Sequence, residues 1–174
     1  MSELDYAYGS FGAAGVIGLI SVVGSTYGVV TRSRTRVNFP FLFNGIGLAT
    51  VPAALGGVLA GAYLYKIAGK DIEELGNSNY GYFIKEKKEY KNYQEQTAIS
   101  IMITSLGFPI AASSLFLDIN DLSVNAGRIR TALVVLSGLI TIGGSIGIAV
   151  NGTSATSVRS DILKQIDDIN NGRY

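Results

Sequence analysis

Uncharged stretches divide this chain into four long windows that separate its charged segments. The windows cover residues 6–31, 37–65, 96–117 and 131–158. A helix rises about 1.5 Å per residue, so roughly 20 residues are enough to cross the hydrocarbon core of a bilayer. Each window is long enough, and we therefore predict four membrane-spanning helices. Their approximate bounds are residues 11–30, 43–65, 97–117 and 131–150.

The windows show no polar face at a 3.6-residue period, which a surface helix of a soluble domain would have. Four helices buried in a soluble core are therefore the less favoured alternative. The first window is too long for the apolar part of a signal peptide, and the residues before it, MSELDYAYGS, are acidic rather than basic. The predicted fold class is an all-α integral membrane protein, a bundle of four transmembrane helices with polar helical extensions outside the membrane.

Small residues recur four positions apart in every predicted span. In lipid no hydrophobic force draws helices together, so their association depends on close backbone approach at such residues. We predict that these faces pack the bundle, within one chain or between chains. The predicted helix-packing residues are Gly24, Gly28, Gly57, Gly61, Gly107, Ala111, Gly143 and Gly147.

Two prolines, Pro52 and Pro109, lie near the centres of the second and third spans. A proline lacks the backbone N–H and tends to kink its helix. The broken helices of a transporter site would also contain such residues. Because no ionisable residue lies beside either proline, we interpret both as structural kinks.

The first loop contains Arg32, Arg34 and Arg36. Arginines beside a membrane contact lipid phosphates and help to fix topology; contact with a partner protein is the alternative. Acidic residues before the first span and arginines after it favour an N-terminus outside, whereas the lysines of the middle loop, residues 66–96, favour the opposite orientation. Since the first span usually dominates, we favour the N-terminus outside.

The middle loop is predicted to have two parts. Residues 70–74 read as a charged continuation of the second span, ended by the turn-forming residues 76–79. Residues 80–96 read as a polar helix that leads into the third span. The loop belongs with the spans to a membrane domain of residues 1–154.

Residues 155–174 form the second predicted unit, an amphipathic helix that ends at Asn171 and Gly172. An apolar stripe follows one face of this helix, and we expect another protein surface to cover it. The acidic balance of the helix makes an anionic lipid surface a poor partner. The predicted docking residues are Val158, Ile162, Leu163, Ile166 and Ile169.

Composition excludes most chemistry. Only 16% of the 174 residues are charged and the net charge is +1, so we expect no nucleic-acid partner. The chain has no cysteine and no histidine, which removes thiolate chemistry, the commonest metal ligand and the usual general base. The spans contain no acidic residue. We therefore expect no enzyme activity, no cofactor and no metal.

The segment SVVGSTYG, residues 21–28, resembles the first helix of the rotor-ring proteolipids of V-type ATPases, which are small four-span proteins. The spacing from Tyr27 to Pro52 is similar as well. The resemblance implies a carboxylate in an outer helix that carries the ion. Here the corresponding part of the second span reads PAALGGVLAG, and the fourth span offers only small residues in that part. A rotor subunit of this kind would lack the ion-carrying carboxylate.

These features favour a non-catalytic structural or accessory subunit of a larger membrane assembly. Its partners would be membrane lipids and other membrane protein subunits, with a hetero-assembly favoured over a homo-oligomer. A small channel or pore lined by hydroxyl groups is one alternative, and a degenerate proteolipid-like rotor subunit is another.

Overall fold

The computed structural model describes residues Gly12, Val16 and Ile20 and the ranges 40–75, 83–116 and 124–172. The described part is helical and contains no strand. Its elements are α2 (Pro40–Ile67), α3 (Lys70–Leu75), α4 (Ile84–Phe116) and α5 (Val124–Asn170). Most of the predicted first span lies outside the described residues, and the three residues described there are helical.

Three of the described helices, α2, α4 and α5, are long and apolar enough to cross a membrane. They contain 28, 33 and 47 residues, which corresponds to lengths of about 42, 50 and 70 Å at 1.5 Å per residue. All three exceed the roughly 30 Å of a hydrocarbon core. The fold is compatible with a multi-pass integral membrane protein.

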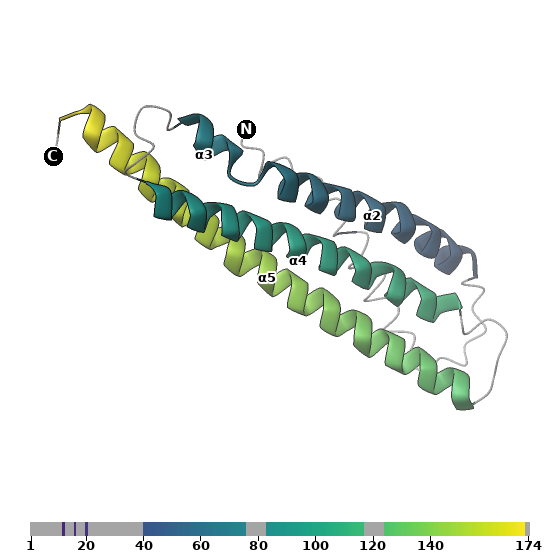
Figure 1. Ribbon diagram of the computed structural model, residues 1–174. Helices are drawn as coiled ribbons and strands as arrows, with labels where there is room; N and C mark the ends of the chain where they lie inside the picture. The colour runs from purple at the N-terminus through teal and green to yellow at the C-terminus, as the bar shows by residue number, and fades with distance from the viewer. Residues whose placement is uncertain are drawn as a thin grey trace.

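Helix α4 is the central element of the described part. Figure 1 shows α2 on one side of it and α5 on the other, both running along its length. The two outer helices pack extensively on α4 and make at most slight contact with each other. Side chains of α4 therefore face two different partners.

The boundary between α2 and α3 corrects one expectation. Residues 70–74 do not continue the second span, because the helix breaks at Ala68 and Gly69 and a separate short helix follows. Gly69 has a φ of +85°, which is in the left-handed region that side chains disfavour. Its N–H leaves the helical pattern and donates to the side chain of Gln94 instead.

The polar helix predicted before the third span is confirmed from Ile84 onward. It is continuous with the apolar part, so that α4 runs without interruption from Ile84 to Phe116. Pro109 lies inside this helix and Pro52 lies inside α2, and both helices continue past their proline.

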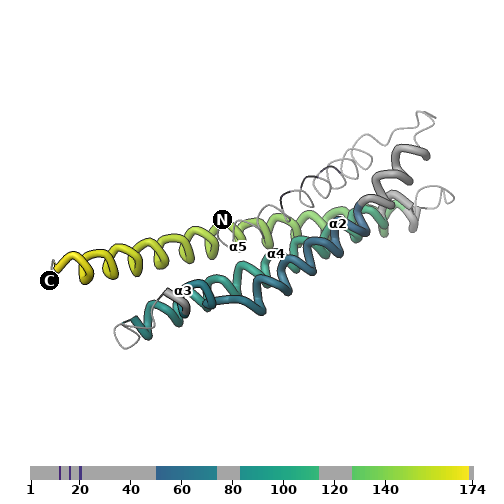
Figure 2. Tube along the Cα trace, turned by 90° about the horizontal axis from the view of Figure 1, so that it is seen from above, coloured from purple at the N-terminus to yellow at the C-terminus, as the bar shows by residue number. Residues whose placement is uncertain are grey.

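The amphipathic C-terminal segment is likewise continuous with the fourth predicted span, and both belong to α5. The helix ends where the sequence predicts. Asn171 N–H donates to the Asp167 carbonyl at 2.9 Å, and Gly172 follows with a φ of +63°, as is common at helix C-termini. In Figure 2 the last turns of α5 extend beyond the start of α4.

A cluster of buried hydrophobic residues lies at one end of the bundle. It joins the end of α2, α3, the charged beginning of α4 and the end of α5. We call it the junction cluster, and its members are Leu64, Ile72, Tyr90, Ala98, Ile101, Ala155 and Ile162. Because four helices contribute, the polar extensions are folded onto one another rather than projecting separately.

Candidate functional site

A relay of hydrogen bonds crosses the junction cluster. The Gly69 N–H donates to Gln94 Oε1 at 2.6 Å, Gln94 Nε2 donates to the Tyr90 hydroxyl at 2.6 Å, and that hydroxyl donates to Asp71 Oδ2 at 2.8 Å. Tyr90 and Gln94 lie one turn apart on α4, so both reach the α2–α3 turn. The relay fixes the turn and α3 against α4.

Arg159 of α5 adds a third helix to this site. Its Nε lies 3.5 Å from Asp71 Oδ2, and the two side chains are 36% and 19% exposed. A pair of this geometry and exposure contributes little stability, typically about 0–1 kcal/mol. Its effect is mainly positional, because it directs the carboxylate of Asp71 between α4 and α5.

Tyr90 belongs to the charged first part of α4, before the apolar span predicted at residues 97–117. Burial raises the pKa of Tyr90 far above its ordinary value, and the hydrogen bond to Asp71 raises it further. The phenol therefore stays protonated and acts as a donor. A neutral buried tyrosine that is already bonded at both ends suits a structural role better than proton transfer.

A second set of contacts brings α4 and α5 close together within the apolar region. A methyl group at Gly144 would meet Thr104 Oγ1, and would lie 3.0 Å from the Thr104 backbone N and 3.1 Å from the Ser100 carbonyl. A methyl group at Gly147 would meet Ser100 Oγ. Hydroxyl side chains of α4 thus occupy the space that two glycines of α5 leave free.

The reverse contact occurs one turn further along. A methyl group at Gly107 of α4 would lie 2.5 Å from Thr141 Oγ1 of α5. Thr141 is only 4% exposed, and its hydroxyl has no hydrogen-bond partner among the described residues. By contrast, the hydroxyls of Thr104 and Ser105 donate to carbonyls of their own helix at 2.7 and 2.8 Å.

Helix α2 approaches α4 at Gly61. A methyl group there would lie 2.6 Å from Met102 Cγ and 2.8 Å from the Ala98 carbonyl. Gly57, one turn earlier, is buried.

The other predicted packing residues are placed as follows. Ala111 is buried on α4, whereas a methyl group added at Gly143 on α5 would have no atom within 4 Å. Gly24, Gly28 and the arginines of the first loop, Arg32, Arg34 and Arg36, lie outside the described residues. The role of these small residues in assembly stays a prediction.

The predicted docking stripe is partly covered by the chain itself. Ile162 is 1% exposed inside the junction cluster, and Val158 and Ile166 pack against that cluster. Burial of these side chains therefore needs no partner protein. Leu163 and Ile169 are half-buried, and they are the members of the stripe that a partner could still cover.

The relay through Gln94 was not predicted from the sequence. A weak signal exists, because Tyr90, Gln94, Thr97, Ala98 and Ile101 follow a 3–4 residue spacing that carries the buried face of the apolar span back into the charged segment. In the part of the chain that the structure describes, no group of three acidic side chains is placed to hold a metal ion.

No family model, no curated protein and no solved structure matches this chain. The resemblance to rotor-ring proteolipids therefore rests only on residues 21–28 and on the spacing from Tyr27 to Pro52.

Proposed function

We propose that this chain is a non-catalytic structural or accessory subunit of a larger membrane protein assembly. It would cross the membrane four times, with its N-terminus outside. Its partners would be lipids and other membrane subunits rather than further copies of itself.

The observation that carries the proposal is that the polar side chains are hydrogen-bonded within the protein. The Tyr90 hydroxyl donates to Asp71 and accepts from Gln94. The hydroxyls of Thr104 and Ser105 bond within α4. Polar groups of this kind could form a catalytic or transport site, but here they are bonded within α4 or, at Tyr90 and Asp71, join α4 to α3. This supports a role in assembly.

Solubilisation in a mild detergent, followed by identification of the proteins that co-migrate, tests the proposal. We expect the chain to run within a complex that contains other membrane proteins. A lone monomer would overturn the proposal.

A variant of the C-terminal helix tests how the complex is held. Changing Leu163 and Ile169 to aspartate alters the half-buried part of the stripe and spares the junction cluster. We expect insertion to persist and the partners to be lost. The matched control is Ser160→Asp with Lys164→Asp, because both residues are exposed on the same helix. Retention of the partners by the first variant would mean that the tail is not the docking element.

Packing through small residues is part of the proposal and has its own test. Gly61→Leu should disrupt the bundle, because the Ala98 carbonyl 2.8 Å from the first added carbon cannot move aside. Gly56→Leu is the control, since no atom lies within 4 Å of a methyl group at Gly56. Equal stability of the two variants in detergent would refute close packing at Gly61.

Four spans place both termini on one side of the membrane. Because the chain has no native cysteine, single cysteines at Ser2 and Asn171 can be labelled without background. We expect an impermeant maleimide to reach both from the same face. Labelling from opposite faces would exclude an even number of spans.

A hydroxyl-lined pore is the second candidate function. One observation favours it, the buried hydroxyl groups that follow α4 and α5: Thr97, Thr104, Ser105, Ser137 and Thr141. Purified protein in liposomes should nevertheless carry no gradient-driven proton current if the first proposal holds. A saturable current would favour the pore.

A further inference from the structure

A shallow hollow of about 420 Å³ lies on the surface of α5, toward the end of its apolar part. Its described lining comes from one helix and consists of Ile148, Ala149, Gly152, Thr153 and Thr156. The hollow follows the helix over two turns, with residues spaced three and four apart. This is the shape of a helix-packing face.

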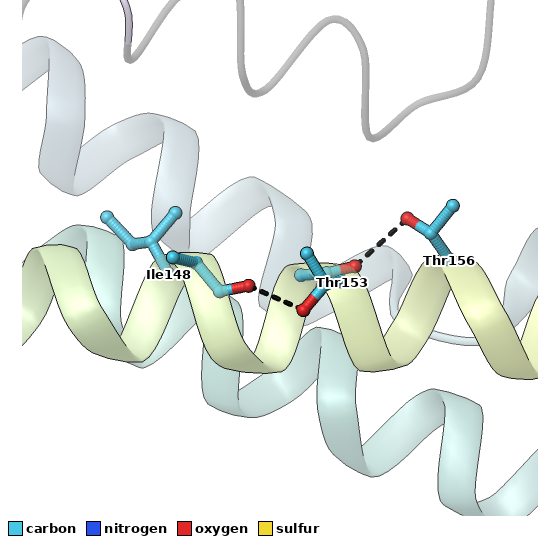
Figure 3. A pocket seen from close by; sticks show the side chains of 5 residues that line it. Ile148, Thr153 and Thr156 are labelled. Atoms are coloured by element: carbon cyan, nitrogen blue, oxygen red, sulfur yellow. Dashed lines mark hydrogen bonds between the residues drawn. The ribbon is translucent and has the colours of Figure 1, made fainter.

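The chemistry of the lining is apolar in spite of its two threonines. Thr153 Oγ1 donates to the Ala149 carbonyl at 2.8 Å, and Thr156 Oγ1 donates to the Gly152 carbonyl at 2.9 Å. Figure 3 shows both hydroxyls turned to oxygens of α5 itself. With the hydroxyls bonded, the lining offers methyl groups, Ile148 and two small residues. It suits an apolar helix better than a polar ligand.

One edge of the hollow borders the junction cluster, because Ile148 packs against that cluster, but most of its lining faces away from α4. Gly144 and Ile162 lie on the α4 face of α5. Ala149, Thr153 and Thr156 are exposed, and at 100° per residue they lie roughly 120–180° around the helix from those two residues. Since α2 packs on α4 rather than on α5, neither described long helix fills this position.

We propose that the hollow seats the chain's own first span, residues 11–30. This proposal rests on the four-span topology, which brings the beginning of the first span to the same depth as residues 145–156. The stretch has the length of one membrane crossing, and only residues 31–39 separate it from the start of α2.

The described residues of the first span also indicate which of its faces is available. Gly12, Val16 and Ile20 are helical and share one face at a spacing of four, and Val16 and Ile20 are 59% and 54% exposed. That face points away from the protein. The opposite face, about 160–200° around the helix, carries only small residues: Ala14, Gly18 and Ser25. Small residues on both surfaces allow close backbone approach.

Disulfide mapping in the full-length protein tests whether the first span lies in the hollow. The cysteine pair Ala14→Cys and Ala149→Cys should cross-link when membranes are treated with copper phenanthroline. A second pair, Gly18→Cys and Ser145→Cys, guards against misfolding of the first. Trypsin cleavage at the first-loop arginines then separates the two parts of the chain. The N-terminal fragment should stay attached to the rest until a reductant is added.

The matched control pairs Val16→Cys with Ala149→Cys, because Val16 is on the exposed face. It should release the N-terminal fragment without reductant. A cross-linked dimer of twice the mass from the first pairs would place a second copy in the hollow and overturn the proposal. Release of the fragment from both test pairs would leave lipid as the occupant and overturn it as well. Labelling of the two termini from opposite faces would refute the four-span topology. Labelling from one face without a cross-link would refute only the position of the first span in the hollow.

Discussion

The hydroxyl of Tyr90 donates a hydrogen bond of 2.8 Å to the carboxylate of Asp71, across 19 residues of sequence. This bond ties the central helix α4 to the short helix α3. Gln94 extends the tie to the α2–α3 turn through Gly69, and Arg159 extends it to α5. Four helices are thereby fixed at one end of the bundle, where the charged segments leave the apolar region.

Tyr90→Phe should destabilise the protein. The substitution keeps the ring but leaves the Gln94 amide without its acceptor inside a buried cluster, and an unmet buried polar group costs about 1–3 kcal/mol. We expect a lower midpoint of thermal unfolding in detergent. Tyr93→Phe is the control, because Tyr93 is half-buried and takes no part in the relay. Equal midpoints for the two variants would show that the relay does not contribute to stability.

Gly69→Ala should loosen the α2–α3 turn. Its φ of +85° costs a side-chain-bearing residue about 1–2 kcal/mol, and the added methyl group would lie 3.2 Å from Lys91 Cβ. We expect faster cleavage by a protease near the turn. Gly172→Ala is the control, since Gly172 also has a positive φ but nothing lies within 4 Å of the new methyl group. An unchanged cleavage rate at Gly69→Ala would contradict the described geometry of the turn.

Gly144→Ala should weaken the α4–α5 contact. Its methyl group would meet the Thr104 hydroxyl and the α4 backbone, and overpacking of this kind costs about 1–3 kcal/mol. The neighbouring Gly143→Ala faces open space and should instead gain helix propensity. The measurement is the unfolding midpoint in one detergent. A lower midpoint for Gly143→Ala than for Gly144→Ala would mean that α5 is rotated relative to α4.

Thr141→Val should stabilise the bundle or leave it unchanged. The hydroxyl of Thr141 is buried without a hydrogen-bond partner among the described residues. Replacing such a hydroxyl by a methyl group of similar size removes its desolvation cost, which is up to about 1–3 kcal/mol of stability. Thr153→Val is the control at an exposed, bonded hydroxyl. A clear loss of stability at Thr141 would show that its oxygen accepts a contact that matters, for which the Cα–H of Gly107 is a candidate, since a methyl group there would lie 2.5 Å from that oxygen.

The sequence by itself determined where the long helices lie and that they are apolar enough to cross a membrane. Uncharged runs longer than a membrane crossing predict α2, α4 and α5, because in lipid every backbone polar group must be bonded within its own helix. The end of α5 near Asn171 was equally readable, since a glycine at that position ends a helix for local reasons. These features depend on residues within a single helix.

Tertiary structure decided which faces meet. GxxxG spacing selects Gly143 and Gly147, yet the close approach to α4 falls on Gly144 and Gly147, because the rotation of α5 is set by its partner helix rather than by its own pattern. The break at Gly69 depends on an acceptor 25 residues away in Gln94. Ile162 is buried in the junction cluster, because α5 continues without a break from its apolar part to the helices that form this cluster.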